Sequence, residues 1–376
     1  MKTATDNQAQ VWDLPIRLFH WLLVAMFALA WWSAGHPQQL DVHLLAGYTI
    51  AALLIFRVVW GLVGTWHARF RSFAYGPTRV INYLRDLFGP RTQHPVGHNP
   101  AGAWAIFAML ALLLAITLSG LVVLGGEEGH GPLANVVSLE TGIAWHEPHE
   151  WLAWIILLLV VVHLVGVAVE SLLHRDNLVT AMISGFKRTA TPQPAIANHR
   201  GVAAVMAAVW VGAVVAMALP WLRADEKHPY QPFAGTTLPD NATWRAECGS
   251  CHQAYHPQLL PARSWRLLLT QQDNHFGESL GLDEATIAEL MKFHVDNAAD
   301  HPLMEAAWYV AHSLKPNETP LRITETPYWR KTHAAIPEAV WRDPRVNGRG
   351  NCAACHSDAE QNTFTDAAMH LPRSKP

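Results

Sequence analysis

Charged residues are scarce in this sequence. Only 15% of its 376 residues are Asp, Glu, Lys or Arg, whereas a soluble domain carries about 25%. The deficit lies in residues 1–222, where 23 residues are charged, against 34 in the shorter stretch 223–376. This pattern excludes a disordered chain, a coiled coil and a simple cytosolic enzyme, and it predicts a membrane-embedded part followed by a water-soluble part.

The sequence also lacks a basic excess, spare cysteines and the common catalytic motifs. Its formal net charge of −3 argues against nucleic-acid binding, which needs a basic surface. All four cysteines belong to two copies of one motif, so none is left for a disulfide. We find no Rossmann fingerprint, P-loop, nucleophile elbow or metalloprotease motif. The 22 histidines, in contrast, are many for a mostly apolar protein.

Five apolar stretches are long enough, or nearly so, to cross the ~30 Å hydrocarbon core of a membrane as helices. They are residues 16–34, 43–64, 102–124, 149–172 and 201–222. Loop charges predict their orientation, because cytoplasmic loops are rich in Lys and Arg. Two loops carry the basic residues: Arg69, Arg71, Arg79, Arg85 and Arg91 in the first, and Arg175, Lys187, Arg188 and Arg200 in the second.

The loops that alternate with these, 35–42 and 125–148, contain neither Lys nor Arg. The N-terminus is therefore expected in the cytoplasm, and with five crossings everything after Trp221 is expected outside it. No signal-peptide pattern precedes the first helix, so we expect that helix to be its own anchor.

Two copies of a CxxCH motif lie in the water-soluble part. They are Cys248-Gly-Ser-Cys251-His252 and Cys352-Ala-Ala-Cys355-His356. This is the attachment motif of c-type haem, in which two thiols add to the vinyl groups and the histidine binds the iron. A zinc site would not need a histidine after each second cysteine, and a redox dithiol would lie in a βαβ unit. Covalent haem attachment occurs outside the bacterial cytoplasm, in agreement with the loop charges.

Each c haem iron takes a second axial ligand from elsewhere in the chain. Spacing alone does not choose among the available side chains, and a methionine would raise the reduction potential relative to a histidine. The candidates are His275, His294, His301, His333, His370, Met291, Met304 and Met369.

Four histidines fall within or at the ends of the predicted spans, where ionisable residues are costly and usually functional. His149 and His163 are 14 residues apart, so they share one helix face at depths about 21 Å apart. His20 on the first helix matches the depth of His163, and His43 on the second matches His149. Facing histidines hold b-type haem in helix bundles. We therefore predict an inner haem b between His20 and His163 and an outer one between His43 and His149.

The water-soluble part resembles the dihaem cytochrome c family over residues 240–372. The resemblance rests on Glu247-Cys-Gly-Ser-Cys-His-Gln-Ala-Tyr255, Leu260-Pro, Ser264-Trp265, His275-Phe-Gly277, Ile323-Thr-Glu-Thr-Pro327, His333 and Asn351-Cys352. In that family two histidines bind each haem iron, which implies His275 and His333 as the second ligands here. Met369-His370 departs from the family pattern and leaves a further ligand candidate.

The membrane part is similar to bacterial cytochrome b561 and to the nickel-iron hydrogenase cytochrome b subunit over residues 10–190. The matching motifs are Asp13-Leu-Pro-Ile-Arg17-Leu-Phe-His20-Trp21, His43-Leu-Leu-Ala-Gly47, Arg57-Val-Val-Trp-Gly61, His67-Ala-Arg-Phe70 and Gly97-His-Asn-Pro100. The resemblance implies a four-helix bundle with two haem b groups and quinone chemistry. The fifth helix lies outside this core and is expected to tether the c domain.

These features predict an all-α protein with a four-helix dihaem b bundle, a fifth transmembrane helix and a small, mostly helical periplasmic dihaem c domain. The expected domains are residues 1–190, 191–222 (linker and fifth helix) and 223–376, held at the bacterial inner membrane. We expect an electron carrier between the membrane quinone pool and a soluble periplasmic redox protein. Its cofactors would be two haem b and two covalently bound haem c, with a quinone as substrate.

Two alternatives stay open. A terminal reductase or a superoxide–quinone oxidoreductase would need a haem iron with an open position. A haem-bearing anchor subunit of a dehydrogenase or hydrogenase would use the c domain as its contact surface. No catalytic side chain is predicted, the direction of electron flow is undecided, and a homodimer is left open.

Three polar residues at the level of the inner haem mark the expected quinone entry: Arg17, Arg57 and His98. Arg57 follows His43 by 14 residues and therefore lies on the same helix face about 21 Å deeper. A charge at that place either contacts a haem propionate or orients a quinone oxygen. The propionate interpretation is slightly favoured.

Overall fold

The computed structural model describes residues 8–87, 96–174, 176–188, 199–223, 233–361 and 363–371. Within it the chain forms two compact units, one of residues 1–120 and 147–222 and the other of residues 121–146 and 223–376. Arg91 and Arg175, two of the basic loop residues, lie outside the described residues, as do most of the linker before the fifth helix and residues 224–232.

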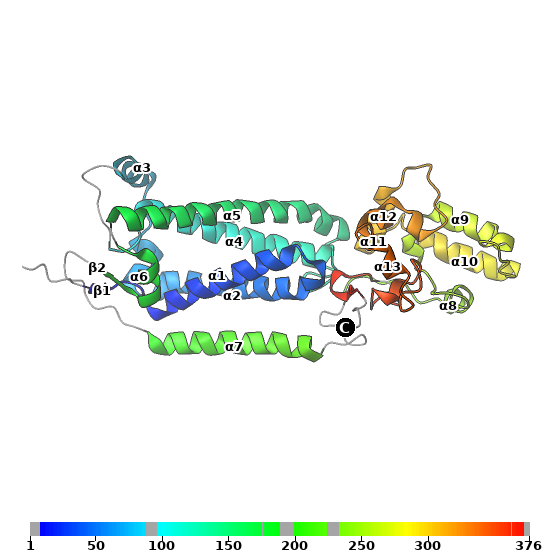
Figure 1. The fold of residues 1–376 in the computed structure, drawn as a ribbon, viewed down its shortest axis with the longest axis horizontal. Helices are drawn as coiled ribbons and strands as arrows, with labels where there is room; N and C mark the ends of the chain where they lie inside the picture. The colour runs from blue at the N-terminus through cyan, green and yellow to red at the C-terminus, as the bar shows by residue number, and fades with distance from the viewer. Residues whose placement is uncertain are drawn as a thin grey trace, which may run out of the picture. The chain divides into compact units, whose positions relative to one another are not determined.

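Four long helices confirm the first four predicted spans. They are α1 (Leu14–Ala34), α2 (Leu40–Val63), α4 (Pro100–Gly126) and α5 (Leu139–His174), and each is long and apolar enough to cross a membrane. Figure 1 shows them running side by side. A cluster built from all four helices, with Ile50, Leu54, Leu113 and Ile156 at its centre, forms the core of this bundle.

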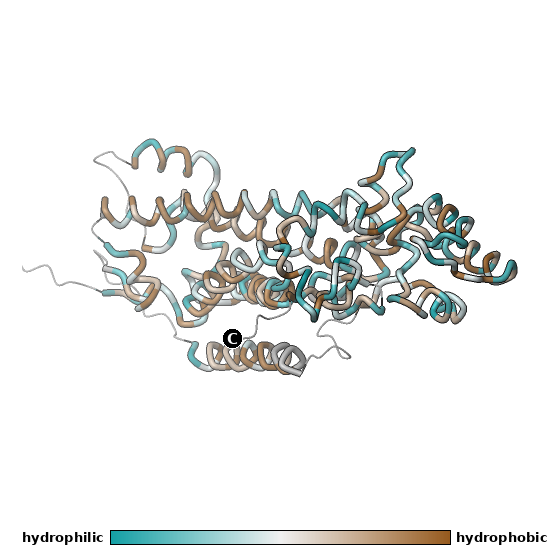
Figure 2. Tube along the Cα trace, turned by 45° about the vertical axis from the view of Figure 1, so that its right-hand side comes forward, coloured by the Kyte–Doolittle hydropathy of each residue, from teal (hydrophilic) through white to brown (hydrophobic). Residues whose placement is uncertain are grey.

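The outward faces of these helices are apolar as well. Ile55 is 68% exposed and Leu158 is 65% exposed, and Figure 2 shows the hydrophobic colouring continuing along the long helices. In water such exposure would be unfavourable, whereas in a bilayer these side chains contact lipid. The chain is therefore a membrane protein.

Asp13 fixes the start of α1 against the end of α2. Its carboxylate accepts a hydrogen bond from the Ile16 amide at 2.8 Å and so caps the helix. The same carboxylate accepts hydrogen bonds from Trp60 Nε1 at 3.0 Å and from Thr65 Oγ1 at 2.7 Å. Asp13 is fully buried. The three hydrogen bonds replace those that its carboxylate would form with water, which lowers the free-energy cost of burying its charge.

The fifth predicted span is not supported. Residues 201–222 do lie in a helix, α7 (Arg200–Arg223), but its apolar described part is only Arg200–Ala216. That stretch rises about 26 Å at 1.5 Å per residue, which is short of the ~30 Å hydrocarbon core. The described apolar stretch therefore does not support a fifth span, although α7 as a whole has 24 residues.

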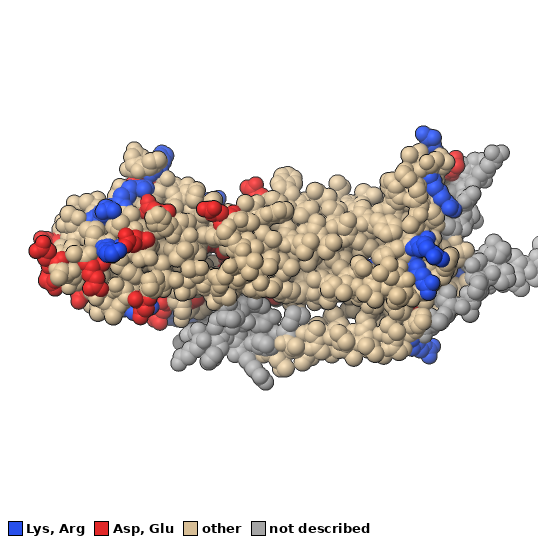
Figure 3. Space-filling model, turned by 180° about the vertical axis from the view of Figure 1, so that it is seen from behind, with Lys and Arg blue, Asp and Glu red and all other residues tan. Residues whose placement is uncertain are grey.

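A small sheet closes the first unit and departs from the all-α expectation. Strand β1 (Gln8–Gln10) pairs antiparallel with β2 (Phe186–Arg188), and Ala9 lies opposite Lys187. Two short helices, α3 (Pro77–Asp86) and α6 (Leu178–Ser184), lie at the same end of the bundle (Figure 1). Figure 3 shows Lys and Arg side chains gathered at this end.

Short helices make up most of the second unit. They are α8 (Ala242–Cys248), α9 (Ala262–Thr270), α10 (Glu284–Asp296), α11 (Glu305–Ser313), α12 (Pro327–Thr332) and α13 (Glu338–Trp341), and they confirm the mostly helical C-terminal domain. One core cluster joins Trp244 of α8 to Leu269 of α9 and Phe293 of α10. A second joins Leu260, Trp265 and Ala298.

Candidate functional site

The two CxxCH motifs lie at the ends of short helical segments. Cys248 is the last residue of α8, and Cys352 is the first residue of a single 3₁₀ turn, Cys352–Ala354. The other two cysteines, Cys251 and Cys355, lie just beyond these segments. None of the four cysteines is in a disulfide, so all four are available for attachment to haem vinyl groups.

The histidine of the first motif lies opposite a predicted ligand. The ring centroids of His252 and His275 are 6.3 Å apart, and the ring planes are inclined at 23°. His252 Nδ1 donates a hydrogen bond to the carbonyl of Gln253 at 2.7 Å, which leaves Nε2 unprotonated and able to bind a metal. His275 Nδ1 is buried and has no hydrogen-bond partner among the described residues.

The histidine of the second motif also lies opposite a predicted ligand. His356 and His333 have ring centroids 6.2 Å apart and ring planes inclined at 56°. His333 Nδ1 donates to the carbonyl of Trp329 at 2.9 Å, and its ring stacks on the Trp329 indole at 4.4 Å. His356 Nδ1 is buried, and no described residue forms a hydrogen bond with it.

The other candidate ligands have different surroundings. His294 is buried and belongs to the core: its ring lies 4.5 Å from that of Trp265, tilted at 48°, and its Nδ1 donates to the Leu290 carbonyl at 2.8 Å. His301 is exposed, and Met304 is buried. His370 lies next to the second motif through its backbone amide, which donates to the Cys355 carbonyl at 2.8 Å. The structure therefore brings His275 and His333, rather than these residues, to face the motif histidines.

One predicted pair in the bundle shows the same spacing. His43 of α2 and His149 of α5 have ring centroids 6.3 Å apart and ring planes inclined at 77°. His43 Nδ1 donates to the Ala30 carbonyl of α1 at 3.0 Å. His149 Nδ1 lies 2.9 Å from the Ser119 hydroxyl of α4. Sequence reasoning missed Ser119, whose only signal is a hydroxyl inside a long apolar run.

The second bundle pair is also brought together. His20 and His163 are close enough for their charges to interact, and the His20 ring packs edge-on against Trp21 at 5.1 Å. His20 Nδ1 is buried without a hydrogen-bond partner in the part of the chain that the structure describes. The two bundle pairs draw on α1, α2 and α5, as the depth argument predicts.

The measured ring spacing fits a metal ion between two imidazoles. A transition metal binds an imidazole nitrogen at about 2 Å, and the ring centroid lies about 1 Å further away, so two rings on opposite sides of one iron have centroids about 6 Å apart. The three measured pairs lie 6.2–6.3 Å apart. Residues at these three places therefore fit a haem iron with two histidine ligands.

Arg57 and His98 share a buried aromatic pocket near the end of the bundle that carries β2. The Arg57 guanidinium donates to the Ala68 carbonyl at 3.2 Å and lies 4.5 Å above the Phe70 ring. His98 lies between Trp12 at 4.6 Å and Phe73 at 4.3 Å. We call Arg57, His67, His98 and Lys187 the inner basic group.

Burial, and then the charges of Arg57, Lys187 and His67, lower the pKa of His98 to about 3. His98 is therefore neutral at pH 7. Arg17 takes a separate place, because its guanidinium donates to the Ile183 carbonyl of α6. Sequence reasoning did not assign His67 and Lys187 to this group, since only the folded chain brings them to His98.

The second unit contains a cluster of acidic residues that the sequence did not reveal. Glu127 accepts hydrogen bonds from His146 at 2.8 Å and from Tyr309 at 3.4 Å. Burial, and then the charges of Asp366 and Glu127, raise the pKa of Glu305 to about 8, while His146 lowers it. Burial likewise raises the pKa of Glu128 and of Asp366. The cluster therefore holds protons at neutral pH.

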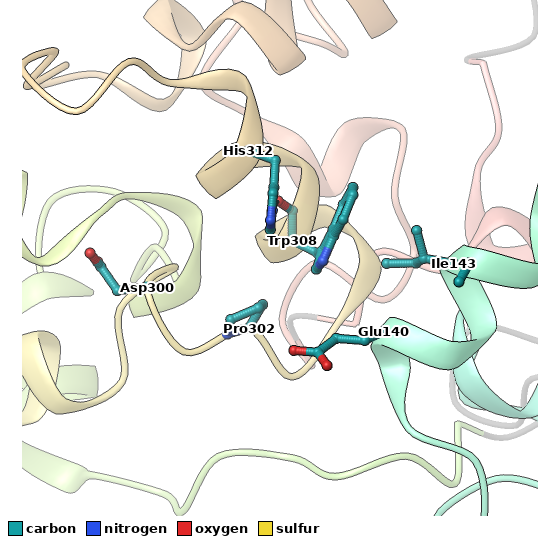
Figure 4. A pocket seen from close by; sticks show the side chains of 7 residues that line it. Glu140, Ile143, Asp300, Pro302, Trp308 and His312 are labelled. Atoms are coloured by element: carbon teal, nitrogen blue, oxygen red, sulfur yellow. The ribbon is translucent and has the colours of Figure 1, made fainter.

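A cavity of about 500 Å³ opens in the same unit. Figure 4 shows Glu140 and Ile143 on one side of it and Trp308 and His312, whose rings stack at 3.9 Å, on another. None of the predicted haem ligands is among the described residues that line this cavity.

Comparisons with known proteins match the apolar part and the more charged part of the chain to two different families, with residues 186–243 matched by neither model. The model of the prokaryotic cytochrome b561 family matches residues 11–185, and the dihaem cytochrome c model matches residues 244–364. The chain is 26% identical over 220 residues to a probable Ni/Fe-hydrogenase B-type cytochrome subunit of Rhizobium leguminosarum bv. viciae, covering 49% of this chain and 90% of that one. The corresponding protein of Cupriavidus necator is 26% identical over 214 residues, covering 47% and 86%.

Two solved structures match the C-terminal part. A dihaem cytochrome c from Rhodobacter sphaeroides is 38% identical, with 34% of this chain and 100% of that chain covered and a TM-score of 0.31. A dihaem cytochrome c from Shewanella baltica is 33% identical, with 36% and 95% covered and a TM-score of 0.29. The chain thus joins an N-terminal domain of the prokaryotic cytochrome b561 family to a C-terminal dihaem cytochrome c domain.

Proposed function

We propose that this chain carries electrons between the membrane quinone pool and a soluble periplasmic redox protein, through two b haems and two c haems. The observation that carries the proposal is the recurrence of one histidine spacing, 6.2–6.3 Å, once in the membrane bundle and twice in the cytochrome c domain. When bound, haem iron supplies one-electron transfer without a change of ligands.

The ligand assignments follow from the pairs. In the bundle, His20 with His163 and His43 with His149 would hold the two b haems. In the second unit, the four cysteines would hold the c haems covalently, and the axial ligands would be His252 with His275 and His356 with His333. Two histidines on each iron leave no open position, which favours an electron carrier over a terminal reductase or a superoxide–quinone oxidoreductase.

The inner basic group is the proposed contact for a haem propionate or a quinone. The Arg57 guanidinium already donates to Ala68 and lies on Phe70, so part of its donor capacity remains for an anion. Its neighbours His67, His98 and Lys187 are basic, whereas one carboxylate, that of the buried Asp13, also acts on Arg57. An anionic propionate suits this surrounding better than a neutral quinone ring, and we keep it as the favoured interpretation.

Replacing Arg57 by leucine separates the two interpretations. A propionate contact predicts a shifted reduction potential of one b haem with quinol reactivity largely retained. A quinone contact predicts slow reduction by quinol with unchanged haem spectra and potentials. Arg17→Leu serves as the matched control, because that guanidinium bonds to α6 instead.

The orientation, the domain boundaries and a fifth crossing of the membrane by α7, which this orientation requires, are all part of the proposal. The basic residues at the end of the bundle that carries α3 and β2 (Figure 3) support a cytoplasmic position for that end, and the CxxCH motifs require the second unit to be periplasmic. A reporter that is active only outside the cytoplasm should be active when fused after Pro376 and inactive when inserted near Tyr83. The opposite pattern would contradict this orientation.

Reduction by quinol tests the proposed function directly. The purified, oxidised chain is mixed with a water-soluble quinol, and the b and c haem bands are followed in time. We expect the b bands to be reduced first and the c bands to follow, because the quinol gives up its two electrons and two protons within the membrane, beside the proposed b haems, and the c haems receive electrons through them. Reduced b haems beside c haems that stay oxidised would contradict the proposal.

A second candidate is a haem-bearing subunit of a larger complex. It is favoured by the relatives that are named as hydrogenase B-type cytochrome subunits. Co-purification of a catalytic subunit in stable proportion would support this role, and purification of an active chain without such a subunit would contradict it.

A further inference from the structure

We infer that Ser119 is a positioning residue for His149 and fixes the protonation of its ring. Ser119 is 3% exposed in the middle of the apolar helix α4. Its hydroxyl oxygen lies 3.0 Å from the Ile116 carbonyl and 2.9 Å from His149 Nδ1. Helix α4 supplies no predicted ligand, so this contact is its link to the predicted outer haem.

The direction of the hydrogen bonds follows from counting hydrogens. A serine hydroxyl has one hydrogen, and the Ile116 carbonyl can only accept. With its one hydrogen donated to Ile116, the hydroxyl can only accept from Nδ1–H of His149, and this is the direction that we infer. With the proton on Nδ1, the Nε2 atom of His149 carries a lone pair and can bind iron.

The next residue along α4 completes the arrangement. A Cβ atom at Gly120 would lie 3.0 Å from His149 Cε1, which is tighter than an ordinary carbon–carbon contact. Glycine leaves room for the imidazole, and the neighbouring serine bonds to it. The pair Ser119-Gly120 therefore sets both the place and the tautomer of the ring.

The shorter contact of the opposite ligand is with a backbone carbonyl, and the Ser33 hydroxyl also lies 3.4 Å from His43 Nδ1. His43 Nδ1 donates directly to the Ala30 carbonyl at 3.0 Å, so both rings of the outer pair carry the proton on Nδ1 and a lone pair on Nε2. A hydrogen bond from Nδ1–H makes the imidazole a stronger donor to iron and stabilises the ferric state. Loss of the Ser119 acceptor is therefore expected to raise the reduction potential of the outer b haem.

The test compares Ser119→Ala with Ser119→Thr, which keeps the hydroxyl. In Ser119→Ala we expect the potential of one b haem to rise and its binding to weaken about 10-fold, with the other b haem and both c haems unchanged. Ser119→Thr should resemble the unmodified chain. Thr117→Ala is the matched control, because the Thr117 hydroxyl also bonds to its own helix, at Leu113.

Each outcome decides the inference. Unchanged potentials in Ser119→Ala would overturn it, and so would an equal loss of haem in the alanine and threonine variants. The inference rests on the proposed ligand role of His149, so His149→Ala is measured beside it. If that variant keeps both b haems, the ligand assignment fails, whereas a failure of quinol reduction alone leaves the Ser119 result intact.

Discussion

His43 and His149 present their rings to each other with centroids 6.3 Å apart and planes inclined at 77°. In the cytochrome c domain, the rings of His252 and His275 have the same spacing but are inclined at only 23°. The two proposed sites thus share a ligand set and differ in ligand orientation.

This difference predicts distinct electron paramagnetic resonance signals. Nearly parallel imidazole planes separate the iron d orbitals in energy, whereas nearly perpendicular planes leave two of them close together. We expect a rhombic low-spin signal from the His252–His275 haem and a highly anisotropic low-spin signal from the His43–His149 haem. His43→Ala should remove only the anisotropic signal. If the anisotropic signal persisted in His43→Ala, it would have to come from another haem, and the prediction would be wrong.

The distal ligands of the c haems can be tested one at a time. Replacing His275 or His333 by alanine removes one axial ligand, so one c haem should become high-spin and bind carbon monoxide. The unmodified chain should bind it at neither c haem. His301→Ala, at an exposed position, is the control. Unchanged spectra in both ligand variants would transfer the role to His370 or a methionine.

Asp13 is predicted to stabilise the bundle. Asp13→Ala leaves the Trp60 and Thr65 donors unpaired in a buried place and removes the cap of α1, at a cost of about 2 kcal/mol. Thermal unfolding in detergent, followed by the Soret band of the b haems, measures the loss. Thr65→Ala removes one of these contacts and should cost less. Equal stability of Asp13→Ala and the unmodified chain would contradict the prediction.

Glu305 is predicted to make the second unit less stable as the pH rises. Its pKa is about 8 in the folded chain and about 4.3 when unfolded, so between these values the folded state binds the extra proton. The contribution of Glu305 to stability should therefore fall with rising pH, by at most about 1.4 kcal/mol per pH unit.

Thermal unfolding between pH 5 and pH 9, followed at the c haem bands, checks this dependence. The groups around Glu305 are Glu127, Glu128, Asp366, His146, Tyr309 and Tyr328. Glu305→Gln should flatten the pH profile. Glu284→Gln, an exposed residue in the first turn of α10 as Glu305 is in the first turn of α11, should leave it unchanged. An equal profile in all three proteins would refute the prediction.

Sequence reasoning found the residues whose positions follow from local spacing. The CxxCH motifs are contiguous, and the depth of each bundle histidine follows from the rise of its own helix. It did not find Ser119, because a contact between α4 and α5 depends on how the helices rotate against each other. It also missed the acidic cluster around Glu305, whose members come from segments far apart in the chain.

Haem content tests the central claim most directly. A pyridine haemochrome assay on the purified chain, before and after extraction with acidified acetone, counts the b and c haems separately. The account predicts equal amounts, with only the b half extracted and the c half retained on the cysteines. A ratio far from one, or complete extraction of the haem, would contradict it.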